Sequence, residues 1–345
     1  MHLENRDRNM GFLEMPYTEN VNATYVNISS VINEKWSYQL GLRAEQTNSE
    51  GDLRANQVNN DKNVKRDYFD VFPSGGLSYK ASDKSAWSLS VGKRLQRPSY
   101  QDLNPFENKL DELTFQKGNP FLNPQYAYNV KLSNTYNNTF STSLSYTYTK
   151  DYITRIMDTL DVSKSFISFQ NLASQEVISL TVSAPYSFTD WWSSYTSLTG
   201  FSTHNQAAFD DGKTIDLSVT TVSFYSQQTF SLPKDFKFEV SGFYNSPGVW
   251  GGTFQFNSMW GMDAGISKKI FKDKGNLKLG VSDIFKTQGF SATSIFGGQV
   301  MDISGYWDSR RFKVNFSYKL GNSKIKSRRR KTGQEAEQNR IKSGN

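Results

Sequence analysis

The chain has 345 residues, no cysteine and a formal net charge of +7. Its mean hydropathy is −0.63, and no run of about 18 apolar residues occurs, which excludes membrane-spanning helices. Eight Lys or Arg and two Glu lie after residue 320, so this tail carries +6 and the rest of the chain only +1. The charge belongs to a tail, which argues against a nucleic-acid-binding fold.

Segments of about ten residues that alternate apolar and polar side chains recur along the chain. Clear examples span residues 36–45, 140–149 and 311–320. Because side chains on a strand alternate between two faces, each segment has one apolar and one polar face. Ten residues at about 3.3 Å each, tilted by about 45°, cross the apolar band of an outer membrane. The pattern predicts an all-β fold, an antiparallel transmembrane β-barrel with about 13–14 strands in this chain.

The predicted connections alternate between short and long. Asn, Asp, Gly and Pro mark short turns at 33–35, 81–85, 137–138, 189–190, 233–235 and 273–275. Long loops are predicted at 47–66, 97–124, 150–175, 202–214, 245–252 and 290–309. Short periplasmic turns and long extracellular loops are typical of bacterial outer-membrane barrels. The tryptophans near strand ends are expected to anchor the barrel at the membrane interfaces.

The strand count is odd, since six short turns join twelve strands and one more strand follows the last long loop. A complete single-chain barrel normally has an even number of strands. We therefore expect the C-terminal portion of a larger barrel, in which the sheet is open or strained. The expected divisions are a residual, poorly ordered extracellular segment at 1–16, the barrel at 17–320 and a basic periplasmic tail at 321–345.

The loop at 97–124 holds four of the nine prolines, which restrict the backbone and make it stiff. Its rigidity favours the interpretation that the loop folds inward and braces the mouth of the barrel. The alternative interpretation is a pre-shaped extracellular rim over the pore that binds a ligand. Charged residues cluster in the same region and are weak candidates for ligand binding: Arg94, Arg97, Asp102, Glu107 and Asp111. Arg43 and Glu45 are expected to face the lumen, because a charge facing lipid is costly.

The sequence shows no arrangement of residues that is typical of a catalytic site. The histidines are His2 and His204, and no His, Cys or carboxylate spacing resembles a metal site. The glycine-rich stretch at 248–252 lacks the Lys-Ser/Thr of a phosphate-binding loop. The sequence thus predicts a protein that is not an enzyme and has no cofactor or metal site.

Seven short motifs resemble one family in their order along the chain. They are Tyr17-Thr-Glu-Asn, Gly41-Leu-Arg-Ala-Glu, Phe72-Pro-Ser, Arg97-Pro-Ser-Tyr-Gln-Asp-Leu-Asn-Pro-Phe, Gly118-Asn-Pro-Phe-Leu-Asn-Pro, Ser282-Asp-Ile-Phe and Phe316-Ser-Tyr-Lys-Leu-Gly-Asn. The chain resembles the TonB-dependent receptor-like outer-membrane β-barrel family of Bacteroidetes.

That resemblance implies a location in the bacterial outer membrane and a 22-stranded barrel plugged by an N-terminal domain. This chain would supply the last thirteen strands. The implied function is uptake of a scarce nutrient, with outer-membrane lipid, a plug outside this sequence, an inner-membrane energising complex and an unknown small ligand as partners. Two alternatives stay open: a complete passive porin-like channel, and a secreted β-rich adhesion protein, whose apolar faces would pack into a buried core.

Overall fold

A computed structural model describes residues 16–52, 63–110, 112–161, 164–209 and 212–320. The expected N-terminal segment, apart from Pro16, and the whole basic tail lie outside these residues. The described part is built almost entirely of strands, which pair antiparallel apart from one parallel pair, and this confirms the all-β prediction. None of its helices has the length and apolar character needed to cross a membrane.

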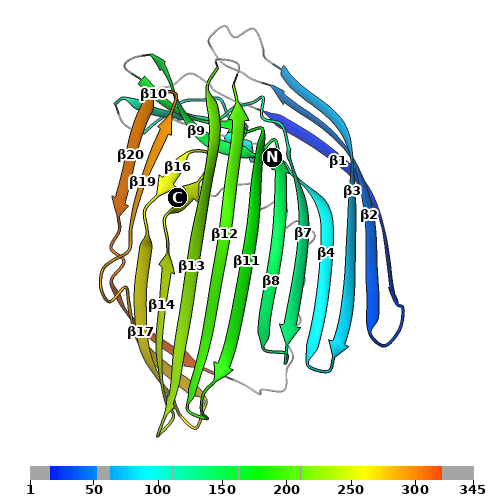
Figure 1. Ribbon diagram of the computed structural model, residues 1–345. Helices are drawn as coiled ribbons and strands as arrows, with labels where there is room; N and C mark the ends of the chain where they lie inside the picture. Colours follow the sequence, from blue (N-terminus) through cyan, green and yellow to red (C-terminus); the bar gives the residue numbers. More distant parts are fainter. Residues whose placement is uncertain (1–15, 53–62, 111, 162–163, 210–211, 321–345) are drawn as a thin grey trace.

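Thirteen of the described strands form one curved sheet, here called the wall (Figure 1). They are β1 (Tyr17–Val31), β2 (Trp36–Asp52), β3 (Asn63–Ser82), β4 (Ser85–Gln96), β7 (Gln125–Tyr136), β8 (Phe140–Lys150), β11 (Ser174–Ser187), β12 (Trp192–Ala208), β13 (Thr214–Leu232), β14 (Phe236–Asn245), β17 (Met259–Ile270), β18 (Gly275–Ser282) and β21 (Arg311–Tyr318). Each pairs antiparallel with the next one in this order, so the expected count of thirteen is confirmed.

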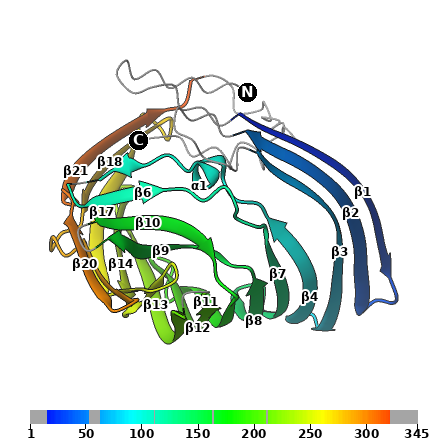
Figure 2. The same ribbon diagram turned by 90° about the horizontal axis from the view of Figure 1, so that it is seen from above.

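The wall is an open sheet seen from above as a deep curve (Figure 2). Among the described residues, β1 pairs only with β2, and β21 pairs only with β18. Because the number of antiparallel strands is odd, the two edge strands run in the same direction. The described residues therefore form no closed barrel.

Period-two alternation sorts the side chains of the wall as expected. Five leucines on β3, β4, β7, β8 and β11 are directly paired across the sheet and all exposed on its convex face: Leu77, Leu89, Leu132, Leu144 and Leu180. Phe312, Val314 and Phe316 continue the exposed apolar face on β21. An adhesion protein would bury these side chains in a core, so the structure contradicts that alternative.

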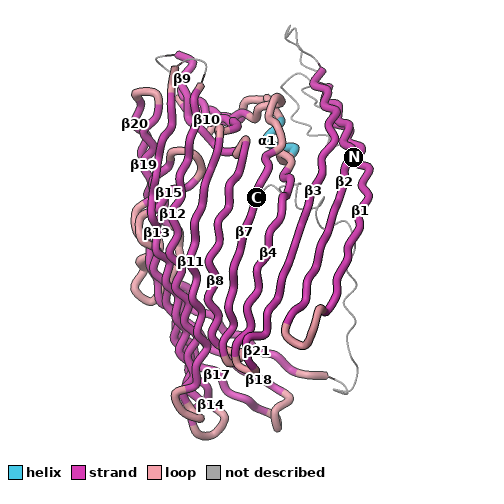
Figure 3. The backbone as a smooth tube through the Cα atoms, turned by 45° about the vertical axis from the view of Figure 1, so that its right-hand side comes forward, coloured by secondary structure: helices cyan, strands magenta, loops and turns pink. Residues whose placement is uncertain are grey.

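The six short turns occur where they were predicted and share one rim of the wall (Figures 1 and 3). At this rim a chain of aromatic contacts runs across β8 to β14. It joins Phe140, Tyr186, Phe188, Trp192, Phe230 and Phe238. Such a row suits the headgroup depth of a membrane interface.

The predicted long loops contain more strand than expected. β2 continues to Asp52 and β12 to Ala208, so the loops predicted at 47–66 and 202–214 were too long. These strand ends have polar residues on both faces, which hides the alternation. A strand that extends beyond the membrane into water needs no apolar face.

The remaining strands form two small sheets at the opposite rim, here called the mouth sheets. The first has the order β5 (Asn108–Lys109), β6 (Thr114–Lys117), β10 (Lys164–Asn171) and β9 (Ile153–Asp161). The second has the order β15 (Gly248–Trp250), β16 (Phe254–Phe256), β19 (Gly289–Phe296) and β20 (Gln299–Tyr306). Figure 2 shows that β6, β9 and β10, with the helix α1 (Tyr100–Leu103), lie within the curve of the wall.

Two apolar clusters hold the mouth sheets in place. One joins Ile156 and Leu172 to Ala207, Ile215 and Phe296, which links both mouth sheets to β12 and β13. The other consists of Leu103, Leu122 and Phe169 and packs the loop after β4 against β10. The long loops are therefore a packed superstructure on the wall.

Candidate ligand-binding mouth

Arg97 attaches the loop after β4 to the concave face of the wall. Its Nη2 donates to Glu45 Oε2 at 2.8 Å and Thr47 Oγ1 at 2.7 Å, and its Nε donates to Tyr68 Oη at 3.2 Å. Glu19 Oε1 lies 3.6 Å from the same Nε. Burial opposes the charge of Arg97, but the bonds to Glu45 and Tyr68 outweigh it and raise the pKa of the guanidinium. Arg97 therefore stays charged and ties β1, β2 and β3 to the loop.

Asp70 is a second centre of charge on this part of the wall. Lys93 Nζ lies 3.3 Å from Asp70 Oδ1, and Tyr126 Oη donates to Asp70 Oδ2 at 2.9 Å. The Lys93 ammonium also lies 4.8 Å from the centre of the Tyr126 ring. The group joins β3, β4 and β7 close to where the β3–β4 pairing ends, at Ser74 and Gly92. Charges at this position thus neutralise one another.

The loop that starts at Arg97 is held by its own backbone. Ser99 Oγ caps α1 by accepting from Asp102 N at 3.2 Å, and Asn119 N donates to Asp102 O at 2.7 Å. At Gly118 a Cβ would lie 2.4 Å from Asn104 O, so only glycine allows this close approach. These contacts make the loop rigid and place it across the concave side (Figure 2), as the bracing interpretation expected.

The five candidate ligand residues do not form one cluster. Arg97 binds Glu45, Thr47 and Tyr68, whereas Asp102 is buried in α1. Arg94 and Glu107 are exposed, and Asp111 lies outside the described residues. Arg43 and Glu45 do share the concave face and form an ion pair at 2.5 Å. Sequence reasoning missed Glu19 and Asp70, although each lies on a strand whose alternation assigns its face.

The stretch from Gly248 to Gly252 forms β15 and a tight turn at the mouth. Asn205 Nδ2 on β12 donates to Gly251 O at 3.2 Å and Gly252 O at 3.1 Å. Gly251 has φ +64°, and a Cβ there would lie 3.1 Å from Thr154 Oγ1. Glycine therefore suits both the backbone conformation and the packing, and the turn is fixed between the wall and β9.

Asp283 organises the passage from β18 to the second mouth sheet. Its carboxylate accepts from Ser309 Oγ at 2.5 Å, Thr287 N at 3.0 Å and Gln288 N at 3.1 Å. Burial opposes ionisation, but these hydrogen bonds outweigh it and hold the pKa of Asp283 below its usual range. The backbone N of Asp283 donates to Asp263 Oδ1 at 2.7 Å, which fixes the segment to β17.

A concave-face hollow of about 220 Å³ lies beside Asp263. Lys278 Nζ reaches Glu239 Oε2 at 2.5 Å. Gly265 and Gly280 are directly paired in this hollow, and the Lys278 chain passes 3.5 Å from the Cβ position of Gly265. Because Gly265 and Gly280 have no side chains, Lys278 has room to cross the sheet and reach Glu239. The charge of Lys278 is therefore also paired within the wall.

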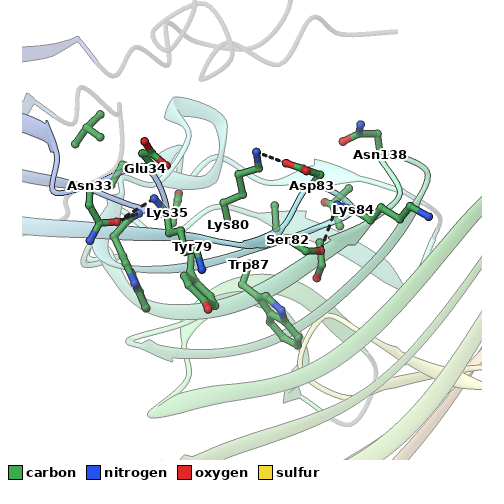
Figure 4. A pocket seen from close by; sticks show the side chains of 17 residues that line it. Asn33, Glu34, Lys35, Tyr79, Lys80, Ser82, Asp83, Lys84, Trp87 and Asn138 are labelled. Carbon is green, nitrogen blue, oxygen red and sulfur yellow. Dashed lines mark hydrogen bonds and ion pairs between the residues drawn. The ribbon is translucent and has the colours of Figure 1, made fainter.

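A larger hollow, of about 400 Å³, lies at the short-turn rim (Figure 4). Lys80 and Asp83 form an ion pair at 2.7 Å on one side, and Tyr79 and Trp87 point to the other side. Asn33 Oδ1 accepts from Lys35 N at 2.9 Å within its turn. The polar groups here stabilise turns, so we place the candidate site at the mouth. Among the described residues, no group of three His, Cys, Asp or Glu could hold a metal ion.

A family model described as the outer membrane protein beta-barrel family matches residues 12–318. The chain belongs to this family. Its location is accordingly the bacterial outer membrane. The comparison with curated proteins found no match.

Solved structures share the fold at low sequence identity. The ferric-catecholate import receptor Fiu from E. coli K12 is 13% identical with a TM-score of 0.61, over 88% of this chain and 45% of that one. The copper transporter OprC is 13% identical with a TM-score of 0.66, over 88% and 50%. The siderophore receptor PiuA from Acinetobacter baumannii is 14% identical with a TM-score of 0.61, over 88% and 44%. The chain thus spans about half the length of these structures.

Proposed function

We propose that this chain is the C-terminal part of a plugged, TonB-dependent outer-membrane receptor that takes up a scarce small ligand. The observation that carries the proposal is the rigid mouth inside an apolar-faced wall: α1 and the first mouth sheet lie within the curve, pinned by Arg97 and by the Leu103 cluster. A passive pore has no need for so much packed structure over its opening. The likeness to import receptors and the motifs shared with the Bacteroidetes family support the same proposal.

The open edges of the wall support a larger barrel. Unpaired backbone groups cost several kcal/mol each in hydrocarbon. Because β1 and β21 run in the same direction, an antiparallel closure needs an odd number of further strands. About nine more would complete the 22-stranded barrel of plugged outer-membrane transporters. We infer that these strands and the plug belong to the same receptor, and that an inner-membrane complex energises it.

Growth under nutrient limitation separates the receptor from a passive porin. Cells lacking the gene are compared with cells lacking the energising complex and with the double mutant, across media that each limit one scarce nutrient. If the chain is a receptor, loss of the gene causes a growth defect in one medium. Cells lacking the energising complex show the same defect, and the defect of the double mutant is no larger. If the chain is a porin, loss of the gene instead slows the influx of many small hydrophilic solutes, such as cephalosporins, whether or not the energising complex is present. That result would refute the proposal.

A further inference from the structure

We propose that Arg155 and Trp250 form a binding site for a planar organic carboxylate at the mouth. Arg155 lies on β9, with its guanidinium carbon 5.1 Å from the centre of the Phe169 ring and 5.7 Å from that of Trp250. The cation thus contacts two aromatic rings. One ring belongs to each mouth sheet, so the site exists only where the two sheets meet.

Arg155 differs from the other cations described above in what it binds. Arg97, Lys93 and Lys278 are each paired with a carboxylate. Within the described part of the chain, the guanidinium of Arg155 has no ion pair and no hydrogen bond, only its two ring contacts. Where a guanidinium meets aromatic rings through its faces, its N–H edge stays available for hydrogen bonds. A half-buried guanidinium with an available edge is suited to receive a ligand anion.

The two rings that hold Arg155 are themselves fixed. Phe169 is buried in the cluster with Leu103 and Leu122. Trp250 precedes the turn that Asn205 holds through the carbonyls of Gly251 and Gly252, and its ring meets Phe290 edge-on at 6.4 Å. The site is therefore pre-organised, and little conformational freedom remains to be lost when a ligand binds.

The shape of the site indicates the class of ligand. The N–H edge of a guanidinium matches a carboxylate in a bidentate pair. The Trp250 side chain is 48% exposed and offers a flat apolar surface beside that edge. A carboxylate joined to a flat ring satisfies both groups at once. This inference rests on the proposed function only for its biological meaning, since binding itself requires no transport.

Calorimetric titration of the purified full chain in detergent micelles with sodium benzoate tests the site, with benzamide as its uncharged counterpart. Wild type is expected to bind benzoate about tenfold or more tightly than benzamide, because only the carboxylate makes the charged pair. Arg155→Gln removes this preference, and Trp250→Ala weakens both ligands. Arg310→Gln, at an exposed arginine just before β21, is the matched control and leaves both affinities unchanged.

Equal benzoate affinity in wild type and Arg155→Gln, or no binding by wild type, would overturn the inference. If Arg155→Gln fails to fold by circular dichroism, Arg155→Lys replaces it. Lysine keeps the charge but lacks the planar N–H donors that bind both oxygens of a carboxylate, so a partial loss of the benzoate preference is expected. An unchanged preference counts against the site. Benzoate binding without the nutrient phenotype would refute the proposed function and leave the site intact.

Discussion

At the scale of single residues, the interior of the molecule depends on matched polar partners. Arg97, Asp70 and Asp283 each form several hydrogen bonds with residues of other elements. Among the described side chains, Thr154 Oγ1 is a buried group that has no hydrogen-bond partner. A buried hydroxyl without a partner loses its hydration and gains nothing in return. Thr154 is therefore a place where the stability of this chain can be improved.

Two buried threonines give a matched test of this argument. Thr154 and Thr47 are 4% and 0% exposed, but Thr47 Oγ1 accepts from Arg97 at 2.7 Å. Thr154→Val is expected to leave the free energy of unfolding unchanged or raise it by about 1 kcal/mol, and Thr47→Val to lower it by about 1.5–3 kcal/mol. Urea unfolding of the full chain in lipid vesicles measures both. Equal losses in the two variants would contradict the assigned partners.

Sequence alone could predict the face of a residue but not its partner. Alternation on β2 placed Glu45 on the concave face, yet its partner Arg97 lies 52 residues away in a loop. Arg155, Phe169 and Trp250 come from two separate loops, and their meeting depends on how the mouth sheets pack. No local pattern records such a contact, so the candidate site was predicted only in part, through Arg97.

At the scale of elements, the row of five exposed leucines defines the membrane-facing side of the wall. Each leucine is directly paired with the next across β3, β4, β7, β8 and β11. The residue after Leu180 on β11, Thr181, faces the concave side, where its hydroxyl lies 3.1 Å from that of Thr199. Neighbouring positions on one strand thus face lipid and lumen.

Arginine scanning at these two neighbours tests the assignment of the faces. Leu180→Arg is expected to lower the free energy of unfolding in vesicles by about 2–4 kcal/mol, because it places a charge against lipid near the membrane midplane. Thr181→Arg is expected to cost less than about 1 kcal/mol, since it projects into a polar lumen. Guanidinium titration of the full chain in vesicles compares them. A larger loss for Thr181→Arg would reverse the two faces.

Short turns were predictable because their chemistry is local. Asn137 and Asn138 have φ of 52° and 53°, and Lys234 and Asp235 have φ of 62° and 60°, the left-handed conformation that Asn and Asp tolerate best. The mouth sheets were not predicted. Strands of two or three residues such as β5 and β16 are too short to show a period, and the pairing of the mouth strands is set by packing against the wall.

At the scale of the whole molecule, the two rims of the wall differ in kind. One rim consists of short turns, and the opposite rim carries both mouth sheets (Figures 1 and 3). The short-turn rim also carries the row of aromatic contacts from Phe140 to Phe238. The alternation of connection lengths in the sequence predicted this division. The odd number of predicted strands also predicted an open or strained sheet, and the described strands form an open one.

Cysteine labelling in whole cells tests the orientation of the two rims. Leu113, next to β6, is exposed at the mouth, and Asn138 lies in the turn between β7 and β8. With long loops outside, Leu113→Cys is expected to react with a membrane-impermeant maleimide in intact cells, and Asn138→Cys only after the cells are lysed. Since the chain has no native cysteine, wild type is the blank. Labelling of Asn138→Cys alone in intact cells would invert the orientation.

The mouth sheets meet the wall through side-chain contacts such as those of Asn205 and Asp263, whereas the wall strands are joined by continuous backbone ladders. This division separates two kinds of selection within one chain. Residence in the membrane constrains every second residue of the wall, whereas the segments between β14 and β17 and between β18 and β21 lie at the mouth and carry no such constraint. Those segments can therefore be exchanged between related chains while the alternation of the wall strands is kept.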